Sequence, residues 1–222
     1  MVFSEFVRLL NFASPIVLFI GSVTGLYYFK SLNVIHKGIF WYLLGLLLVD
    51  LTSRVVGATG NNFIVLLVYS LLEMTLFTWF YFRFFFKAKH RLVMGLSCVA
   101  FFYILWEIMT FERTDMKGFQ SYAKVIDNFI VIILVFSFFH EKINIFKDSK
   151  WENFRLNVVI LLFFSVNLVF FLPLNFLVNE SAGMKFYFWL GIVITTVLFY
   201  LYLTLSIWKN GRTQKLLLSG LR

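Results

Sequence analysis

The sequence predicts an all-α integral membrane protein that crosses the bilayer seven times, with its N-terminus outside and its C-terminus in the cytoplasm. Two observations support this prediction. First, 61% of the 222 residues are hydrophobic and only 14% are charged, which leaves too little polar surface to cover a water-soluble globule of this size. Second, the basic residues gather in every other connection between apolar segments, a distribution typical of multi-pass membrane proteins.

Seven apolar segments are each long enough to cross about 30 Å of hydrocarbon at about 1.5 Å per residue. They cover residues 13–30, 38–58, 62–86, 92–111, 119–140, 154–178 and 185–208. We therefore predict a single transmembrane domain over residues 1–222, with a seven-helix bundle at 13–208 and a basic cytoplasmic tail at 209–222. Residues 3–10 place apolar side chains on one helical face, which predicts that residues 1–12 form either an interfacial helix or the start of the first span.

Proline, glycine and asparagine mark helix ends and contacts. Ser14 and Pro15 suit the N-cap and the first turn of the first span. Residues 57–62 contain two glycines and two asparagines, which predict a tight turn between the second and third spans. Gly21 and Gly25 form a GxxxG pattern, which predicts close packing of the first span against another helix.

Lysine and arginine counts set the predicted orientation. Fourteen of the 20 basic residues fall on one side of the predicted bundle: Lys30, Lys37, Arg83, Lys87, Lys89, Arg91, Lys142, Lys147, Lys150, Arg155, Lys209, Arg212, Lys215 and Arg222. The other side and the membrane interior share the remaining six: Arg8, Arg54, Arg113, Lys117, Lys124 and Lys185. Because short cytoplasmic connections are enriched in Lys and Arg, the first side is predicted to be cytoplasmic, and an odd number of spans places the N-terminus outside.

The formal net charge of +9 would suggest nucleic acid as a partner for a soluble protein. Here the basic residues form short clusters between apolar segments, where they meet anionic lipid headgroups. Membrane lipids are therefore predicted partners, and nucleic acid is not.

Motifs for known chemistry are missing from the sequence. It contains no GxSxG motif, no P-loop and no glycine-rich dinucleotide motif, so hydrolase, ATPase and redox functions have no support. Cys98 is the only cysteine, which excludes an intramolecular disulfide. His36, His90 and His140 map to the cytoplasmic ends of helices without the short spacing of a metal motif. We predict no catalytic residue and no cofactor.

Polar residues within the apolar segments carry the functional information. Such groups are expensive in hydrocarbon and almost always face the bundle interior or a water-filled cavity. The predicted ligand-binding residues are Asp50, Arg54, Tyr69, Glu73, Tyr103, Glu107, Lys124, Asp127, Asn128, Asn167, Asn175 and Trp189. Counted from the charged ends of the helices, their depth places a polar pocket in the outer half of the bilayer.

Helical spacing and charge sharpen this prediction. Asp50 and Arg54 are four residues apart, so they share a helix face and can pair, and Tyr69 and Glu73 have the same spacing. The four predicted buried acids outnumber the two buried bases, Arg54 and Lys124. Either some carboxyls stay protonated, or the pocket holds a cationic ligand or a metal ion. A polar network that only holds the helices together is the structural alternative.

One stretch of sequence carries a resemblance. The run from Asp50 to Arg54, followed by Gly60-Asn61-Asn62 and then Glu73, resembles uncharacterised bacterial seven-helix inner-membrane proteins and the membrane sensor modules that precede histidine kinases. The resemblance covers the second and third spans. It implies a multi-pass protein of the bacterial inner (plasma) membrane. Kinase-type sensors continue into an output domain, so this chain is expected to signal through a separate partner.

The leading hypothesis is a membrane receptor, sensor or accessory subunit. It would bind a small or lipidic ligand in the outward-facing polar pocket and signal to a cytoplasmic or membrane protein partner. The first alternative is an intramembrane enzyme that modifies lipid, with a buried carboxyl as general acid or base. The second alternative is a channel or transporter subunit.

Overall fold

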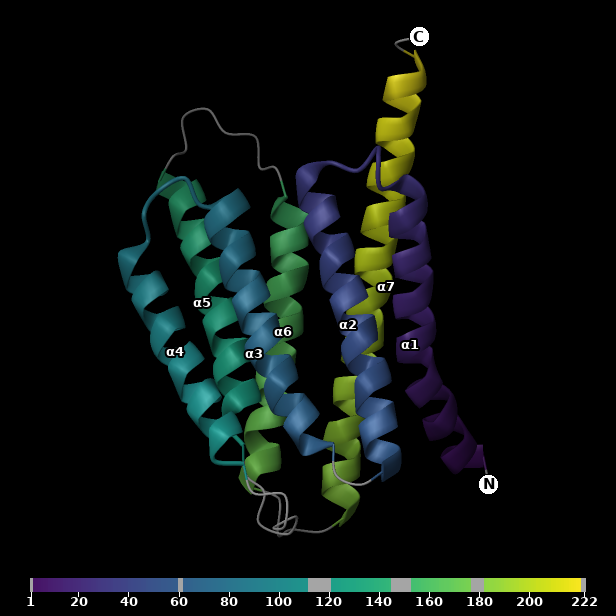
Figure 1. The fold of residues 1–222 in the computed structure, drawn as a ribbon, viewed down its shortest axis with the longest axis vertical. Coiled ribbons are helices and arrows are strands. Elements are labelled where there is room, and N and C mark those ends of the chain that lie inside the picture. The colour runs from purple at the N-terminus through teal and green to yellow at the C-terminus, as the bar shows by residue number, and fades with distance from the viewer. Residues whose placement is uncertain (1, 60–61, 112–120, 145–152, 177–181, 221–222) are drawn as a thin grey trace. The chain divides into compact units, whose positions relative to one another are not determined.

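The computed structural model describes the backbone of residues 2–59, 62–111, 121–144, 153–176 and 182–220, and the side chains of slightly shorter ranges. Within these ranges all regular elements are helices, and there is no strand (Figure 1). The elements are α1 (Val2–Tyr28), α2 (Val34–Thr59), α3 (Phe63–Phe80), the π-helix η1 (Tyr81–Phe85), α4 (Arg91–Met109), α5 (Ala123–Asn144), α6 (Phe154–Phe176) and α7 (Ala182–Gly220). The predicted all-α fold class is therefore confirmed.

Six of these helices are long and apolar enough to cross a membrane. Their apolar parts are Val34–Ala58, Phe63–Phe85, Arg91–Met109, Ala123–Ile143, Phe154–Pro173 and Phe186–Gly220. Large apolar side chains are exposed along them, among them Val99, Phe102 and Trp106 on α4, as expected of helix faces that contact lipid. The chain is thus a multi-pass membrane protein. The apolar part of α1, Phe12–Tyr28, is shorter than the six, so the seventh span stays a prediction.

The start of α1 differs from the prediction. Helix α1 begins at Val2 and contains Pro15 in its interior, so the predicted helix start at Ser14 and Pro15 is wrong. Proline removes one backbone donor, and the helix continues on both sides of that missing hydrogen bond. Residues 2–12 therefore form the first turns of the helix that contains the first predicted span.

The C-terminal helix extends beyond its predicted end at residue 208. Helix α7 has 39 residues and runs to Gly220, a length of about 58 Å at 1.5 Å per residue. Because the hydrocarbon of a bilayer is only about 30 Å thick, part of α7 must lie outside it. The described part of the predicted basic tail is thus a continuation of the last helix.

The chain divides into two compact units, which we treat separately. The terminal unit comprises Met1–Ala58 and Leu190–Arg222, and the central unit comprises Thr59–Trp189. In the terminal unit the two glycines of the GxxxG pattern pack tightly. A Cβ atom on Gly21 would lie 2.5 Å from Thr204 Oγ1, and one on Gly25 would overlap the Phe40 ring. The predicted close packing of this face is therefore confirmed.

Polar contacts hold the turn between α1 and α2 against α7. The backbone N–H of Asn33 donates to Asn210 Oδ1 at 3.2 Å. The ring of His36 contacts Ser206 Oγ at 3.0 Å through Nε2 and Asn33 Oδ1 at 2.7 Å through Nδ1. This histidine is therefore part of the packing at a helix start.

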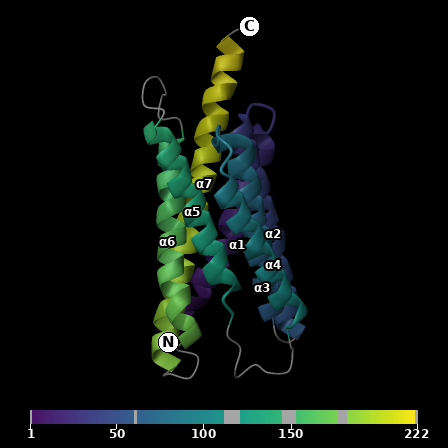
Figure 2. The same ribbon diagram turned by 90° about the vertical axis from the view of Figure 1, so that its left-hand side faces the viewer.

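Helices α3, α4, α5 and α6 form the core of the central unit. Helix α5 packs against α3, α4 and α6, and α3 also packs against α4. Figures 1 and 2 both draw α5 and α6 side by side over most of their lengths. The side chains of Leu67, Ile104, Leu134 and Phe164, one from each helix, are fully buried. The first residues of α5 and the middle of α3 are thereby brought together.

Helix α3 ends in a π-helical turn. The backbone N–H of Phe86 donates to Tyr81 O at 2.9 Å, five residues earlier. The Tyr81 hydroxyl is buried and donates to Asn157 Oδ1 on α6 at 2.6 Å. Next to this turn, the Glu141 carboxylate accepts hydrogen bonds from the backbone N–H groups of Lys87 and Ala88. The connection after η1 is thereby fixed to the end of α5.

Candidate functional site

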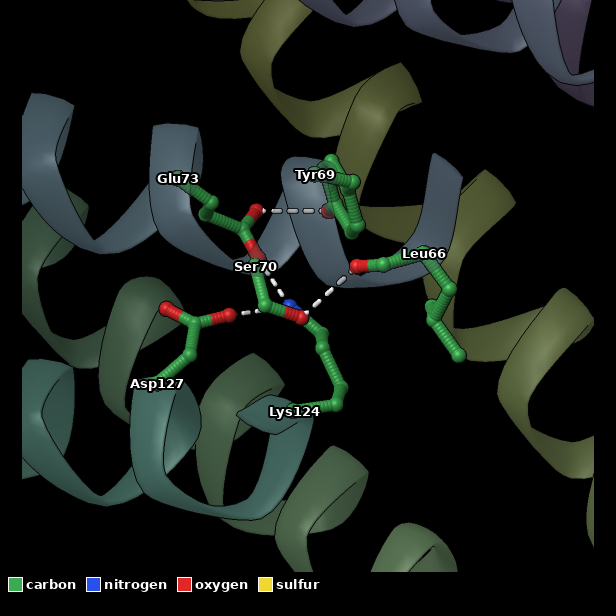
Figure 3. Close-up of polar contacts among 6 residues, drawn as sticks. All are labelled: Leu66, Tyr69, Ser70, Glu73, Lys124 and Asp127. Atoms are coloured by element: carbon green, nitrogen blue, oxygen red, sulfur yellow. Dashed lines mark hydrogen bonds and ion pairs between the residues drawn. The ribbon is translucent and has the colours of Figure 1, made fainter. Parts of the chain in front are cut away.

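A buried ionic cluster lies between α3 and α5. It consists of Tyr69 and Glu73 on α3 and of Lys124 and Asp127 in the first turns of α5, as Figure 3 shows. The Lys124 ammonium donates to Glu73 Oε2 and, at 2.5 Å, to Asp127 Oδ2. The Tyr69 hydroxyl donates to Glu73 Oε1 at 2.7 Å.

Helical spacing explains the two pairs within each helix. Tyr69 and Glu73 are four residues apart, and Lys124 and Asp127 are three apart, so each pair projects from one face. The packing of α3 on α5 then joins the two pairs through Lys124. Below Glu73 in Figure 3, Ser70 is fully buried and donates to the carbonyl oxygen of Leu66, so its hydroxyl is satisfied within its own helix.

The charged groups of the cluster are almost completely removed from solvent. Glu73 is 1% exposed, Lys124 4% and Asp127 0%. The ammonium also lies 4.4 Å from the centre of the Tyr69 ring and 5.8 Å from that of Phe164 on α6. Cation–π contacts of this kind add to the stabilisation of a desolvated cation. Lys124 is thus enclosed by two carboxylates and two aromatic rings.

The cluster combines two acidic side chains with one basic side chain. Glu73 and Asp127 each accept a hydrogen bond from the Lys124 ammonium. Charge in a low-dielectric interior is costly unless it is paired. The carboxylate oxygens of the site are chemically suited to a ligand that donates hydrogen bonds or carries positive charge.

Three buried side chains at or beside the cluster have polar atoms without a hydrogen-bond partner among the described residues. They are Asp127 at Oδ1, Asn128 at both amide atoms and Asn167 at Oδ1. Asn128 is 0% exposed and Asn167 is 2% exposed. Buried polar groups in proteins normally have a partner. These atoms are therefore candidates for contact with a ligand.

Glu107 on α4 approaches the start of α5. Its carboxylate faces the Ser121 hydroxyl and the backbone N–H groups of Tyr122 and Ala123. Neither oxygen makes a hydrogen bond of ordinary geometry in the described part of the chain. Tyr103, one turn earlier on α4, lies near Glu107 and Tyr122 and packs against Trp106 with 6.1 Å between ring centres. The first turn of α5 thus receives polar groups from α4 as well as from α3.

Asp50 and Arg54 form the predicted pair on α2, in the terminal unit. Arg54 Nε donates to Asp50 Oδ2 at 2.7 Å, and the guanidinium lies 5.8 Å from the centre of the Phe12 ring. The Asp50 side chain is 23% exposed, and the Arg54 side chain is 39% exposed. Pairing is therefore confirmed, and a lining shared with the cluster stays a prediction.

Two further predicted residues give no support to the site. Trp189 lies near the start of α7, and its described ring contact is with Phe186 on the same helix, at 6.2 Å. Asn175 lies outside the residues whose side chains the structure describes.

Two polar contacts of the central unit are not predicted by the sequence patterns. One is the hydrogen bond from Tyr81 to Asn157, and the other joins His90 Nε2 to Glu141 Oε2 at 2.8 Å. Glu141 follows Asp127 by 14 residues, a spacing that returns to nearly the same helix face. This periodicity is the signal that would have identified Glu141 as a packed residue.

Comparisons with known proteins give no match: no protein-family model, no curated protein and no solved structure is significantly similar to this chain. In the described part of the chain, no group of three or more His, Cys, Asp or Glu side chains is arranged to hold a metal ion. The site must therefore be interpreted from its own chemistry.

Proposed function

We propose that this chain is a membrane receptor or sensor subunit whose ligand site is the buried ionic cluster of Tyr69, Glu73, Lys124 and Asp127. One observation carries the proposal: Asp127 Oδ1, both amide atoms of Asn128 and Asn167 Oδ1 are buried without a hydrogen-bond partner among the described residues. Buried polar atoms normally have such a partner. A ligand bound at the cluster would supply it.

The proposal includes seven spans in a bacterial inner membrane, with the N-terminus outside and the C-terminus in the cytoplasm. The distribution of Lys and Arg supports this orientation. In that orientation the basic end of α7 extends into the cytoplasm, where Leu216, Leu217 and Leu218 are exposed. A helix end that combines basic and exposed apolar side chains suits an anionic membrane surface or a separate partner protein. The resemblance to kinase-associated sensor modules agrees with such a partner.

Single cysteines test the proposed orientation. In a Cys98→Ser background, Ser4→Cys and Ser219→Cys are each labelled with a membrane-impermeant maleimide. We expect Ser4→Cys to react in intact cells from which the outer envelope has been removed. Ser219→Cys is expected to react only in inverted vesicles. Labelling of both positions from the same side would contradict the seven-span topology.

Ligand binding is tested by the thermal unfolding of the purified protein in lipid nanodiscs. The probe is a small-molecule and ion extract of the host cells, added at constant pH. We expect the extract to raise the unfolding midpoint of the wild type and of Asp50→Asn, but not of Asp127→Asn. Asp50→Asn is the matched control because it removes an acid of a balanced pair outside the cluster. An unchanged wild-type midpoint, or equal shifts in all three proteins, would contradict the proposal.

A further inference from the structure

We infer that the terminal unit binds the headgroups of anionic phospholipids through a basic surface at the turn between α1 and α2 and the adjoining part of α7. The basic surface consists of five residues: Lys30, Lys37, Lys209, Arg212 and Lys215. It lies outside the ionic cluster, so the inference is independent of the proposed ligand site. It also decides between a lipid surface and a partner protein as the occupant of this part of α7.

Contacts within the terminal unit place the five basic residues in one layer. A Cβ atom on Gly211 would lie 2.5 Å from the Tyr28 side chain, and the backbone N–H of Asn33 donates to Asn210 Oδ1. The turn is therefore level with residues 210–211 of α7. Counted from this level at about 1.5 Å per residue, all five basic residues lie within about 8 Å of it. The headgroup region on each side of a bilayer is about 5–7 Å thick, so one layer of headgroups can reach them all.

The apolar segments end at the same level. The apolar part of α1 ends at Tyr28, and that of α2 begins at Val34. On α7, residues 186–208 contain no charged side chain, and Lys209 follows directly. Trp208 is 39% exposed, as is typical of aromatic side chains at the border between hydrocarbon and headgroups. The basic surface therefore begins where the hydrocarbon ends.

No acidic residue balances the basic surface. Residues 26–49 and 190–222 contain neither Asp nor Glu. Asp50 follows Lys37 by 13 residues and so lies about 20 Å farther along α2. In the described part of the chain, none of the five basic side chains takes part in a salt bridge. An anionic partner is thus the complement that this surface lacks.

Aromatic rings hold two of the cations in place. Lys215 Nζ lies 4.8 Å from the centre of the Tyr27 ring and donates to the Tyr27 hydroxyl at 3.2 Å. The Arg212 guanidinium lies 5.7 Å from the centre of the Trp208 ring. Cation–π contacts orient a cation without cancelling its charge. Both cations are exposed and can still bind a phosphate group.

The position of the charges favours lipid over an acidic protein. Beyond Arg212, the described part of α7 contains only one charged residue, Lys215. The other four lie at or inside the level of Arg212, where headgroups surround a membrane-embedded helix. Each basic residue near a layer of anionic headgroups adds to the attraction. An acidic protein would reach the outer part of α7, which has the fewest basic residues.

The test is a lipid titration of the purified full chain in neutral detergent, followed by native mass spectrometry, which resolves each bound lipid. The probes are short-chain phosphatidylglycerol and short-chain phosphatidylcholine. We expect the wild type to bind the first phosphatidylglycerol about tenfold more tightly than the first phosphatidylcholine. Most of this preference should be lost in the α7 variant, which combines Lys209→Gln, Arg212→Gln and Lys215→Gln.

Two control variants should retain the preference. The first removes the same number and kinds of exposed cations from the central unit: Lys87→Gln, Lys89→Gln and Arg91→Gln. The second keeps the charge of α7 while changing the same three side chains: Lys209→Arg, Arg212→Lys and Lys215→Arg. It separates the loss of charge in the α7 variant from any loss of folding.

Three results would overturn the inference. They are equal affinities of the two lipids for the wild type, an unchanged preference in the α7 variant, and an equal loss in the central-unit control. If the wild type has no lipid preference but binds a polyglutamate peptide that the α7 variant does not bind, the surface belongs to an acidic protein. The response of Asp127→Asn to the cell extract tests the ligand site separately, so failure of this inference leaves the proposed function standing.

Discussion

Two groups of charged residues in this protein have similar spacing along their helices and very different surroundings. Asp50 and Arg54 form one carboxylate–guanidinium pair on α2, and both side chains are partly exposed. Glu73, Lys124 and Asp127 form a group of two acids and one base that is almost completely buried. The comparison teaches that charges within apolar segments of similar spacing can be partly exposed or almost completely enclosed. Spacing along one helix therefore does not predict burial.

The largest expected effect is that of removing the shared ammonium. Lys124→Met leaves two buried carboxylates without their cation, which should cost about 3–5 kcal/mol of unfolding free energy. Arg54→Met is the matched variant of the exposed pair and should cost less than about 1 kcal/mol. Denaturant titration of both variants in mixed micelles gives the two values. Similar losses of unfolding free energy would show that burial does not determine how much each charged group contributes to stability.

A steric substitution tests what holds the terminal unit together. A side chain at Gly25 would collide with the Phe40 ring, so Gly25→Leu should lower the unfolding free energy by about 1–3 kcal/mol. Gly45→Leu is the control, because a Cβ atom there meets nothing within 4 Å. The same denaturant titration measures both. If the control loses as much, the loss reflects leucine in a helix rather than the close contact.

A neutral buried hydrogen bond in the central unit tests the effect of burial without a change in charge. Tyr81→Phe removes the 2.6 Å hydrogen bond to Asn157 and should cost about 1 kcal/mol. Since Tyr81 lies two turns from Glu73 and outside the cluster, the response of the unfolding midpoint to the cell extract should be unchanged. A variant that loses this response would show that the site extends along α3.

The smallest effect is expected for the acid of the exposed pair. Asp50→Asn should change the unfolding free energy by less than about 1 kcal/mol, because water compensates a partly exposed guanidinium. Denaturant titration gives the value. A loss as large as that of Lys124→Met would mean that the pair is as critical as the cluster.

Much of this account could be predicted from the sequence, and the limit has a physical reason. Apolar segments predict helices, and spacing of four residues predicts the pairing of Asp50 with Arg54, because both depend on local geometry. The contact between Glu73 and Lys124 joins residues 51 positions apart and depends on how α3 packs against α5. Sequence patterns of single helices carry no information about such packing.

The predicted start of the first helix and the predicted end of the last helix both differ from the structure, and the reason is again physical. Pro15 predicts a helix start because proline is common at that position, but α1 continues through it from Val2. The apolar segment of α7 ends near residue 208, whereas its helix continues to Gly220. Hydrophobicity reports where lipid can surround a helix, and helix propensity decides how far the helix extends.

Infrared difference spectroscopy of the carboxyl groups tests the central claim most directly. Films of the protein in lipid are exchanged between choline buffer and the cell extract, and the carboxyl and carboxylate bands are compared. The account predicts a band change in the wild type and in Asp50→Asn that is absent from Asp127→Asn. A change that persists in Asp127→Asn, or a wild-type spectrum that does not change, would contradict the assignment of the buried cluster as the ligand site.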